Sequence, residues 1–228
     1  MLGKEGIGVM QVAAMATLEC HCGNVSLKLP NPVPKARCGC CCVDCLQRAY
    51  IGSKGMLRSA LKNLLEPVDL IYVDSQIMRP DAATKSRLSL FRLNDANAPN
   101  IGLRTNCCGA VLCTQHQGVH VPHTMATFAN LGPSLKCEVE DVPASRVQLF
   151  TKDWPADRVQ SLARADRLPQ IADPVASNGS PQLTELFAAF QTEASPKPLG
   201  SISYAELCEG MEISVDSSFF EESRFYRP

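Results

Sequence analysis

The chain has 228 residues and a formal net charge of −1 at neutral pH, with 45% apolar and 20% charged residues. This is the composition of an ordinary globular protein. The balanced charge gives no electrostatic attraction to nucleic acid or to an anionic membrane, and no apolar run reaches the ~18 residues of a membrane span. We therefore expect neither nucleic acid nor a membrane as a partner.

Residues 1–15 are expected to be an N-terminal extension that precedes the patterned sequence. Their apolar part is short and interrupted by Gln11, and Glu5 disturbs a basic start, so the segment does not resemble a secretory signal. In a reducing compartment, clustered cysteines bind metal more often than they form disulfides. The sequence therefore predicts a cytoplasmic protein with reduced thiols.

Short strand patterns follow at a spacing typical of antiparallel sheets. Val25, Leu27 and Leu29 alternate with polar residues, as in a half-buried strand. Further patterns, rich in β-branched and aromatic residues, lie at residues 68–73, 88–93, 111–112, 119–121 and 147–150. Because no helical pattern separates each pair, we predict a mainly β protein built from packed antiparallel sheets.

Beyond residue 155 the sequence becomes helical in character. Ser180 is a candidate N-cap for a helix with one apolar face. The face comprises Leu183, Leu186, Phe187 and Phe190. Ser203 and Glu206 form the capping box of a second short helix. We predict a domain over residues 16–155 and a short helical C-terminal extension over residues 156–228.

Cysteine is the unusual residue, with 12 copies gathered mainly in three groups. The groups are Cys20-His21-Cys22-Gly23, the run from Cys38 to Cys45, and Cys107-Cys108-Gly109. Zinc takes about four thiolate ligands in a tetrahedron, and cysteines one or two residues apart on a tight turn can direct two thiolates at one ion. The grouping predicts zinc sites built from distant segments. The expected ligands are Cys20, Cys22, Cys40, Cys42, Cys45 and Cys108.

Within the second group two registers are open. Cys40, Cys42 and Cys45 form a C-x-C-x-x-C pattern, whereas Cys38/Cys41 with Cys42/Cys45 would form two C-x-x-C pairs. Disulfides are disfavoured throughout, because adjacent cysteines close only a strained ring.

Other polar candidates have plainer interpretations. Isolated cysteines are expected to be buried core residues, namely Cys113, Cys137 and Cys208. Three histidines could add a ligand or a proton shuttle, although an exposed strand and turn is the simpler expectation: His116, His120 and His123. His21 is expected to point outward, and Asp44 to accept backbone hydrogen bonds in its loop.

The spacing of the cysteine groups resembles that of a known family. A C-x-C-G turn at Cys20, a C-x-C-x-D-C run at Cys40 and a C-G pair at Cys108 are similar to the glutathione-dependent formaldehyde-activating enzymes, a family that includes centromere protein V. The segment 150–154 resembles that family's closing strand and tryptophan. The double cysteine at Cys107 is similar to an uncharacterised branch, and the resemblance covers about residues 18–155.

The resemblance implies a β-tent-like fold stapled by two zinc ions. One site would be structural, held by Cys20, Cys22 and Cys108, and the other would be a three-cysteine site. The family's reaction joins glutathione to formaldehyde, a carbon–sulfur lyase reaction in reverse. The resemblance thus implies a zinc-dependent lyase with a glutathione-like thiol as its small-molecule partner. A non-catalytic, zinc-stabilised protein-interaction module is the alternative hypothesis.

One position departs from the family pattern. Thr105 stands where the family has a further cysteine, so the first site lacks an expected ligand. Cys107 is the nearest substitute, and Cys113 or His116 could also serve.

Three arginines flank the cysteine groups: Arg37, Arg48 and Arg104. They could pair with the carboxylates of a glutathione-like substrate, or they could be solvated surface residues.

Overall fold

The structure is a computed structural model. It describes residues 16–31, 34–53, 67–116, 123–128, 135–136, 147–154, 156–157, 159–160, 168–174, 180–190 and 195–217. The predicted strand at 119–121, together with His120 and Cys137, lies outside these residues, and the side chains of Phe187 and Phe190 are likewise outside the description.

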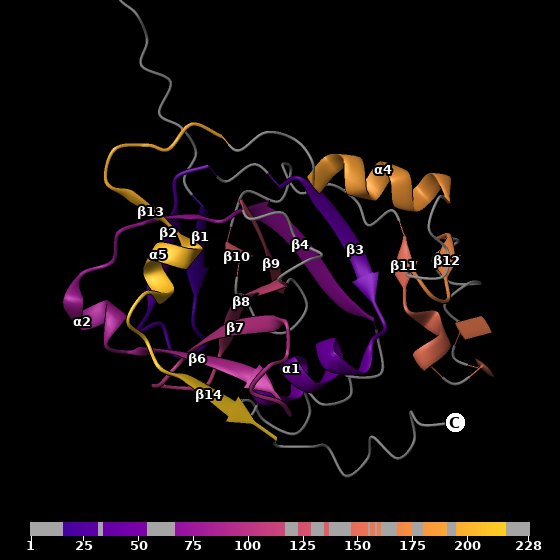
Figure 1. The fold of residues 1–228 in the computed structure, drawn as a ribbon, viewed down its shortest axis with the longest axis horizontal. Coiled ribbons are helices and arrows are strands. Elements are labelled where there is room, and N and C mark those ends of the chain that lie inside the picture. The colour runs from indigo at the N-terminus through magenta and orange to yellow at the C-terminus, as the bar shows by residue number, and fades with distance from the viewer. Residues whose placement is uncertain are drawn as a thin grey trace, which may run out of the picture.

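A large mixed sheet forms the centre of the molecule (Figure 1). The nine strands in spatial order are β12 (Gln170–Ile171), β11 (Gln148–Leu149), β3 (Ala36–Cys40), β4 (Val68–Asp74), β9 (Thr124–Phe128), β8 (Val111–His116), β7 (Asn100–Thr105), β6 (Leu88–Leu93) and β14 (Ile213–Asp216). The six strands from β3 to β6 in this order pair antiparallel. At one edge β11 pairs in parallel with β3 and with β12, and at the other edge β14 pairs in parallel with β6.

Two smaller sheets and several short helices complete the described fold. One sheet has the order β10 (Leu135–Lys136), β1 (Ala16–Glu19) and β2 (Ser26–Leu29), and the other pairs β13 (Ser201–Ser203) with β5 (Gln76–Met78). The helices are α1 (Val43–Ser53), α2 (Ala82–Lys85), η3 (Thr151–Asp153), α4 (Pro181–Phe190) and α5 (Tyr204–Cys208). The prediction of a mainly β protein with packed sheets is confirmed.

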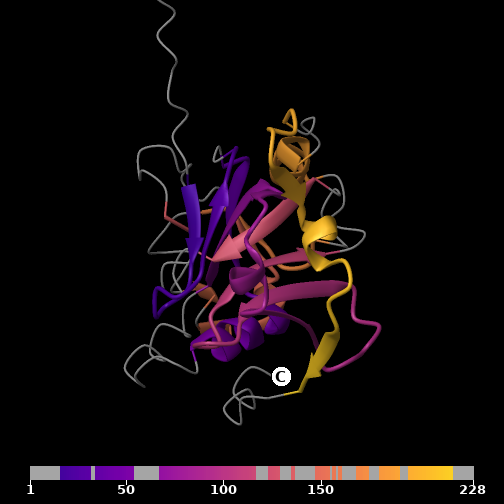
Figure 2. The ribbon, with the colours of Figure 1, turned by 90° about the vertical axis from the view of Figure 1, so that its left-hand side faces the viewer.

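Strand β4 shows how the large sheet carries core on both faces. Leu70 and Tyr72 pack into one apolar cluster with α1 and α4, while Ile71 and Val73 pack into a second cluster with β1 and β2. A strand buried on both faces reads as a nearly continuous apolar run, as this segment does. Figure 2 shows the β1–β2 pair as a separate layer beside the large sheet.

The half-buried strand predicted around Val25 is observed as β2. Val25, Leu27 and Leu29 are buried, and Ser26 and Lys28 between them are exposed. The alternation arises because successive side chains of a strand point to opposite faces.

Residues 156–228, predicted as a helical extension, contain strands as well as helices. The capping box of α5 forms as predicted, with Ser203 and Glu206 exchanging side-chain and backbone hydrogen bonds. Strands β12 and β14 join the large sheet, and Leu183 of α4 is buried against it. In Figure 1, α4 lies near the start of β3 and α1 near its end. No helix of the described residues is long and apolar enough to cross a membrane.

Candidate metal centres

The first centre, defined by Cys20, Cys22, Cys107 and Cys108, forms where two tight turns meet. Strand β1 ends at Glu19, and the turn into β2 carries Cys20 and Cys22; the turn from β7 into β8 carries the other two cysteines. Each turn closes on a glycine in the left-handed region, Gly23 at φ +75° and Gly109 at φ +72°. A side chain rarely adopts that conformation, which explains glycine after each cysteine pair.

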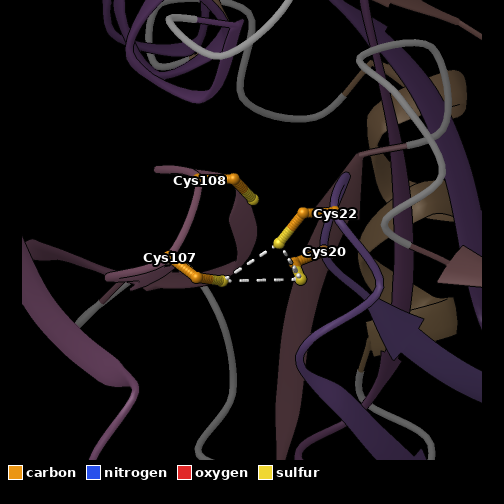
Figure 3. Close-up of side chains that lie close together, drawn as sticks. All are labelled: Cys20, Cys22, Cys107 and Cys108. Atoms are coloured by element: carbon orange, nitrogen blue, oxygen red, sulfur yellow. Dashed lines mark hydrogen bonds between the residues drawn. The ribbon is translucent and has the colours of Figure 1, made fainter.

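The four sulfur atoms of the first centre converge on one point (Figure 3). Cys20 Sγ lies 3.5 Å from Cys22 Sγ and 3.7 Å from Cys107 Sγ, and Cys22 Sγ lies 3.4 Å from Cys107 Sγ. All four ligand atoms lie within 4.8 Å of one another. A tetrahedral ion with metal–sulfur bonds of about 2.3 Å needs sulfur atoms about 3.8 Å apart. The arrangement can therefore hold one metal ion with a complete set of four thiolates.

Hydrogen bonds to sulfur distinguish the thiols of the first centre. The backbone N–H of Val25 donates to Cys20 Sγ over 3.2 Å, and Asn24 Nδ2 donates to Cys22 Sγ over 3.3 Å. Burial nevertheless raises the pKa of Cys20 to about 12, whereas a hydrogen bond from the backbone N–H of Asn24 lowers the pKa of the exposed Cys22. The two thiols therefore differ, because the protein opposes ionisation at Cys20 and favours it at Cys22.

Thr105 supports the first centre from inside. Its side chain is buried, and Thr105 Oγ1 lies 3.5 Å from Cys108 Sγ. Burial tends to raise the pKa of Cys108, but hydrogen bonds from the Thr105 hydroxyl and from backbone N–H groups outweigh it and lower the pKa to about 6. Thr105 is thus a hydrogen-bond partner of a candidate ligand, and Cys107 completes the set of four.

The second centre, defined by Cys40, Cys42 and Cys45, lies where β3 passes into α1. Cys40 is the last residue of β3, and Cys45 lies in the first turn of α1. Cys40 Sγ lies 3.3 Å from Cys42 Sγ, and the backbone N–H of Cys45 donates to Cys42 Sγ over 3.3 Å. The structure thus brings together the three cysteines of the C-x-C-x-x-C pattern. Among the described residues, no fourth cysteine, histidine or carboxylate joins this group.

The thiols of the second centre interact strongly with one another. Hydrogen bonding with Cys42 raises the pKa of Cys40 well above its usual value, and hydrogen bonds from Cys40 and Cys42 lower the pKa of Cys45 well below it. Like charges at such close range oppose one another, so the three thiols cannot all ionise without a cation between them. In the metal-free protein, ionisation is therefore favoured at Cys45 and opposed at Cys40.

Cys38 and Cys41, the members of the alternative register, are fully buried and join neither cluster. Burial raises the pKa of each to about 12. The backbone N–H of Cys41 donates to Leu149 O over 2.8 Å, which ties the segment to β11. Cys113 and Cys208 are likewise outside both clusters, as are His116 and His123.

Arg48 differs from the other two arginines that flank the cysteines. Arg37 is paired with Asp69, and Arg104 is paired with Asp216. The side chain of Arg48 is only 2% exposed, and its Nε and Nη2 have no hydrogen-bond partner among the described residues. Among the described residues, its nearest carboxylate is that of Asp44, which is 4.0 Å away and 52% exposed. For Arg48 the expectation of a solvated surface residue is wrong.

Two contacts beside the centres were not anticipated from the sequence. His21, expected to point outward, places Nε2 2.9 Å from Gly52 O and so connects the first centre to the end of α1. The carboxylate of Asp153 accepts from the backbone N–H of Val43 at the start of α1, and burial together with the charge of Cys42 raises the pKa of Asp153. The spacing of the residues contains no signal for either contact, because both partners are far apart in the chain.

Comparison with family models and with curated proteins identified no relative of this chain. No protein-family model matches the chain, and no curated protein matches it. Two cysteine clusters that can hold a metal ion are therefore the functional feature on which any assignment rests.

Proposed function

We propose that this protein binds two zinc ions, one in a closed structural centre and one in an open centre that takes a thiol as its fourth ligand. This proposal rests on the number of cysteine ligands, which is four in the first centre and three in the second. Structural zinc sites are closed by four protein ligands, whereas functional sites keep one position open. Thiolate sulfur is a ligand that zinc favours, which supports zinc as the metal.

At the open centre we further propose a carbon–sulfur lyase reaction on a thiol adduct such as S-hydroxymethylglutathione. Zinc held there would supply a position at which a thiol loses its proton at neutral pH. In the direction of synthesis, the sulfur forms a bond to the aldehyde carbon, and the thiol proton ends on the former carbonyl oxygen. The reaction is redox-neutral and needs no further reactant. The resemblance in cysteine spacing supports this proposal.

A non-catalytic role is the second candidate, and burial favours it. Cys40 and Cys45 are 3% and 8% exposed, so little of the second centre faces solvent. Three thiolates also leave zinc electron-rich and reduce its power to polarise a carbonyl. In this case the second centre stabilises α1 against β3, and the protein acts through its surface.

Metal counting on matched serine variants tests the zinc proposal. The native protein should bind two zinc ions, the Cys42→Ser variant one, and the Cys41→Ser variant two, because Cys41 is buried next to the cluster but outside it. Elemental analysis gives the ratios. Equal zinc content in the Cys41→Ser and Cys42→Ser variants would contradict the assignment of the second centre.

Thiol binding then separates the two candidate functions. A lyase should bind glutathione at the second centre and form its adduct with formaldehyde, and it should lose both properties in the Cys42→Ser variant. A non-catalytic module should show no turnover with any thiol–aldehyde pair while it keeps its fold in that variant. Nuclear magnetic resonance with isotope-labelled formaldehyde measures adduct formation directly.

A further inference from the structure

The second centre has an unbalanced charge that its own ligands cannot neutralise. Three thiolates around a divalent ion carry one net negative charge, and this charge lies in a largely buried site. Buried charges are costly unless an opposite charge or hydrogen bonds compensate them. A protein that holds such a centre is therefore expected to place a cation beside it.

Arg48 is a buried cation whose charge is likewise not balanced by a close carboxylate among the described residues. Its Nε and Nη2 are buried without a hydrogen-bond partner among the described residues, and its closest carboxylate is half exposed and 4.0 Å away. Of the described arginines, it alone is fully buried. An arginine with unsatisfied donors in the interior calls for an anion, and none of the described carboxylates comes closer to it than 4.0 Å.

The helix places the two unbalanced charges next to each other. Cys45 and Arg48 lie in α1 three residues apart, a spacing that puts both side chains on one face. Arg48 is therefore a buried cation on the same helix face as one ligand of the cluster.

We propose that Arg48 is the internal counter-charge of the three-cysteine centre and makes this centre prefer an anionic thiolate over a neutral molecule as its fourth ligand. The inference rests on the proposed function, because it requires metal at Cys40, Cys42 and Cys45. With Arg48, the loaded centre is neutral and gains one negative charge when a thiolate binds. Without Arg48, the same step would take the buried centre from one negative charge to two.

Cobalt-substituted protein tests this preference through ligand binding rather than turnover. The absorption of the second centre is isolated by subtracting the spectrum of the Cys42→Ser variant, and glutathione and imidazole are each titrated against it. We expect Arg48→Met to weaken glutathione binding roughly tenfold or more, as the loss of a neighbouring charge at intermediate dielectric implies. Imidazole binding should change little. Arg48→Lys should restore the preference in part, and the exposed Arg79→Met should behave like the native protein.

A second measurement avoids any change at Arg48. The double variant Cys42→Ser/Cys107→Ser removes the second centre and leaves three cysteines in the first, where no fully buried arginine lies among the described residues. The ratio of glutathione to imidazole affinity should be roughly tenfold or more lower there than at the native second centre.

The outcomes are distinct. Equal ratios at the two centres, or an unchanged ratio in a folded Arg48→Met variant, would overturn the role of Arg48 while leaving the metal site intact. Native protein without a cobalt signal that depends on Cys42 would instead remove the proposed function, and with it this inference.

Discussion

Thr105 shows how one residue can serve a site without binding its metal. Its hydroxyl contacts Cys108 Sγ at 3.5 Å and contributes to the low pKa of about 6 at that thiol. Threonine is too weak a ligand to replace a thiolate, but a donor aimed at sulfur stabilises the ionised form. The position therefore acts on the charge of the site, and Cys107 supplies the sulfur.

Replacing Thr105 by valine should raise the pKa of Cys108. The two side chains have the same shape, and a hydrogen bond to an ionised group contributes roughly 1.5–3 kcal/mol, so the pKa should rise by about 1 to 2 units. The rate at which iodoacetamide modifies Cys108 in metal-free protein, followed by peptide mass spectrometry, gives its pH midpoint. Thr114→Val is the matched control, because its buried hydroxyl donates to Ile101 O. An unshifted midpoint would remove the proposed role of the hydroxyl.

The same variant should change how stability depends on pH. The pKa of Cys108 is lower in the folded protein than its usual value of 9.0. Its thiolate therefore contributes stability that is fully present above that value and is lost as the pH falls through about 6. The difference in stability between metal-free native and Thr105→Val protein should consequently be larger at alkaline pH than at acid pH.

At the scale of elements, strands with a regular apolar pattern were predictable, whereas the strand and the helix that carry the second centre were not. The patterns around Val25, at 68–73 and at 88–93 appear as β2, β4 and β6, because apolar alternation or a continuous apolar run reflects burial directly. β3 and α1 were not predicted. The run of cysteines between them shows neither the alternation of a strand nor the spacing of a helix, since those residues are placed to direct sulfur atoms rather than to cover a core.

Pairings between distant segments were equally hidden from the sequence. β14 is largely exposed and pairs with β6, more than a hundred residues earlier in the chain. Such a pairing depends on backbone hydrogen bonds, and these carry no side-chain signature. The three groups of cysteines could be predicted as metal ligands from their spacing, whereas the burial of Arg48 required the position of α1.

Helix α4 offers a test of whether residues after 156 fold together with the large sheet. Leu183 is 1% exposed and lies in the same core cluster as β3 and α1. Leu183→Ala should lower the free energy of unfolding by about 2–5 kcal/mol, the usual range for a core leucine. The exposed Thr184→Ala should change it by less than ~0.5 kcal/mol. Urea denaturation of the zinc-loaded protein measures both, and a main transition unaffected by Leu183→Ala would indicate an independent extension.

For the molecule as a whole, the two centres differ in the length of chain that they close. The first centre joins Cys20 to Cys107, 87 residues apart, and so links the β1–β2 layer to the large sheet. The second joins residues within a single strand-to-helix connection. A cross-link restricts the unfolded chain more when it closes a longer loop, so metal at the first centre should contribute more to global stability.

Cys22→Ser should therefore lower the melting temperature of the zinc-loaded protein more than Cys42→Ser does. Cys22 is exposed, so its replacement leaves the core packing unchanged and removes mainly a metal ligand. Hydrogen exchange should show the added loss of protection in β1 and β2, the layer that the first centre fastens. When both variants and the native protein are stripped by a chelator, the gap between Cys22→Ser and native protein should close. A larger loss in Cys42→Ser would mean that the short connection, rather than the long-range staple, holds the fold together.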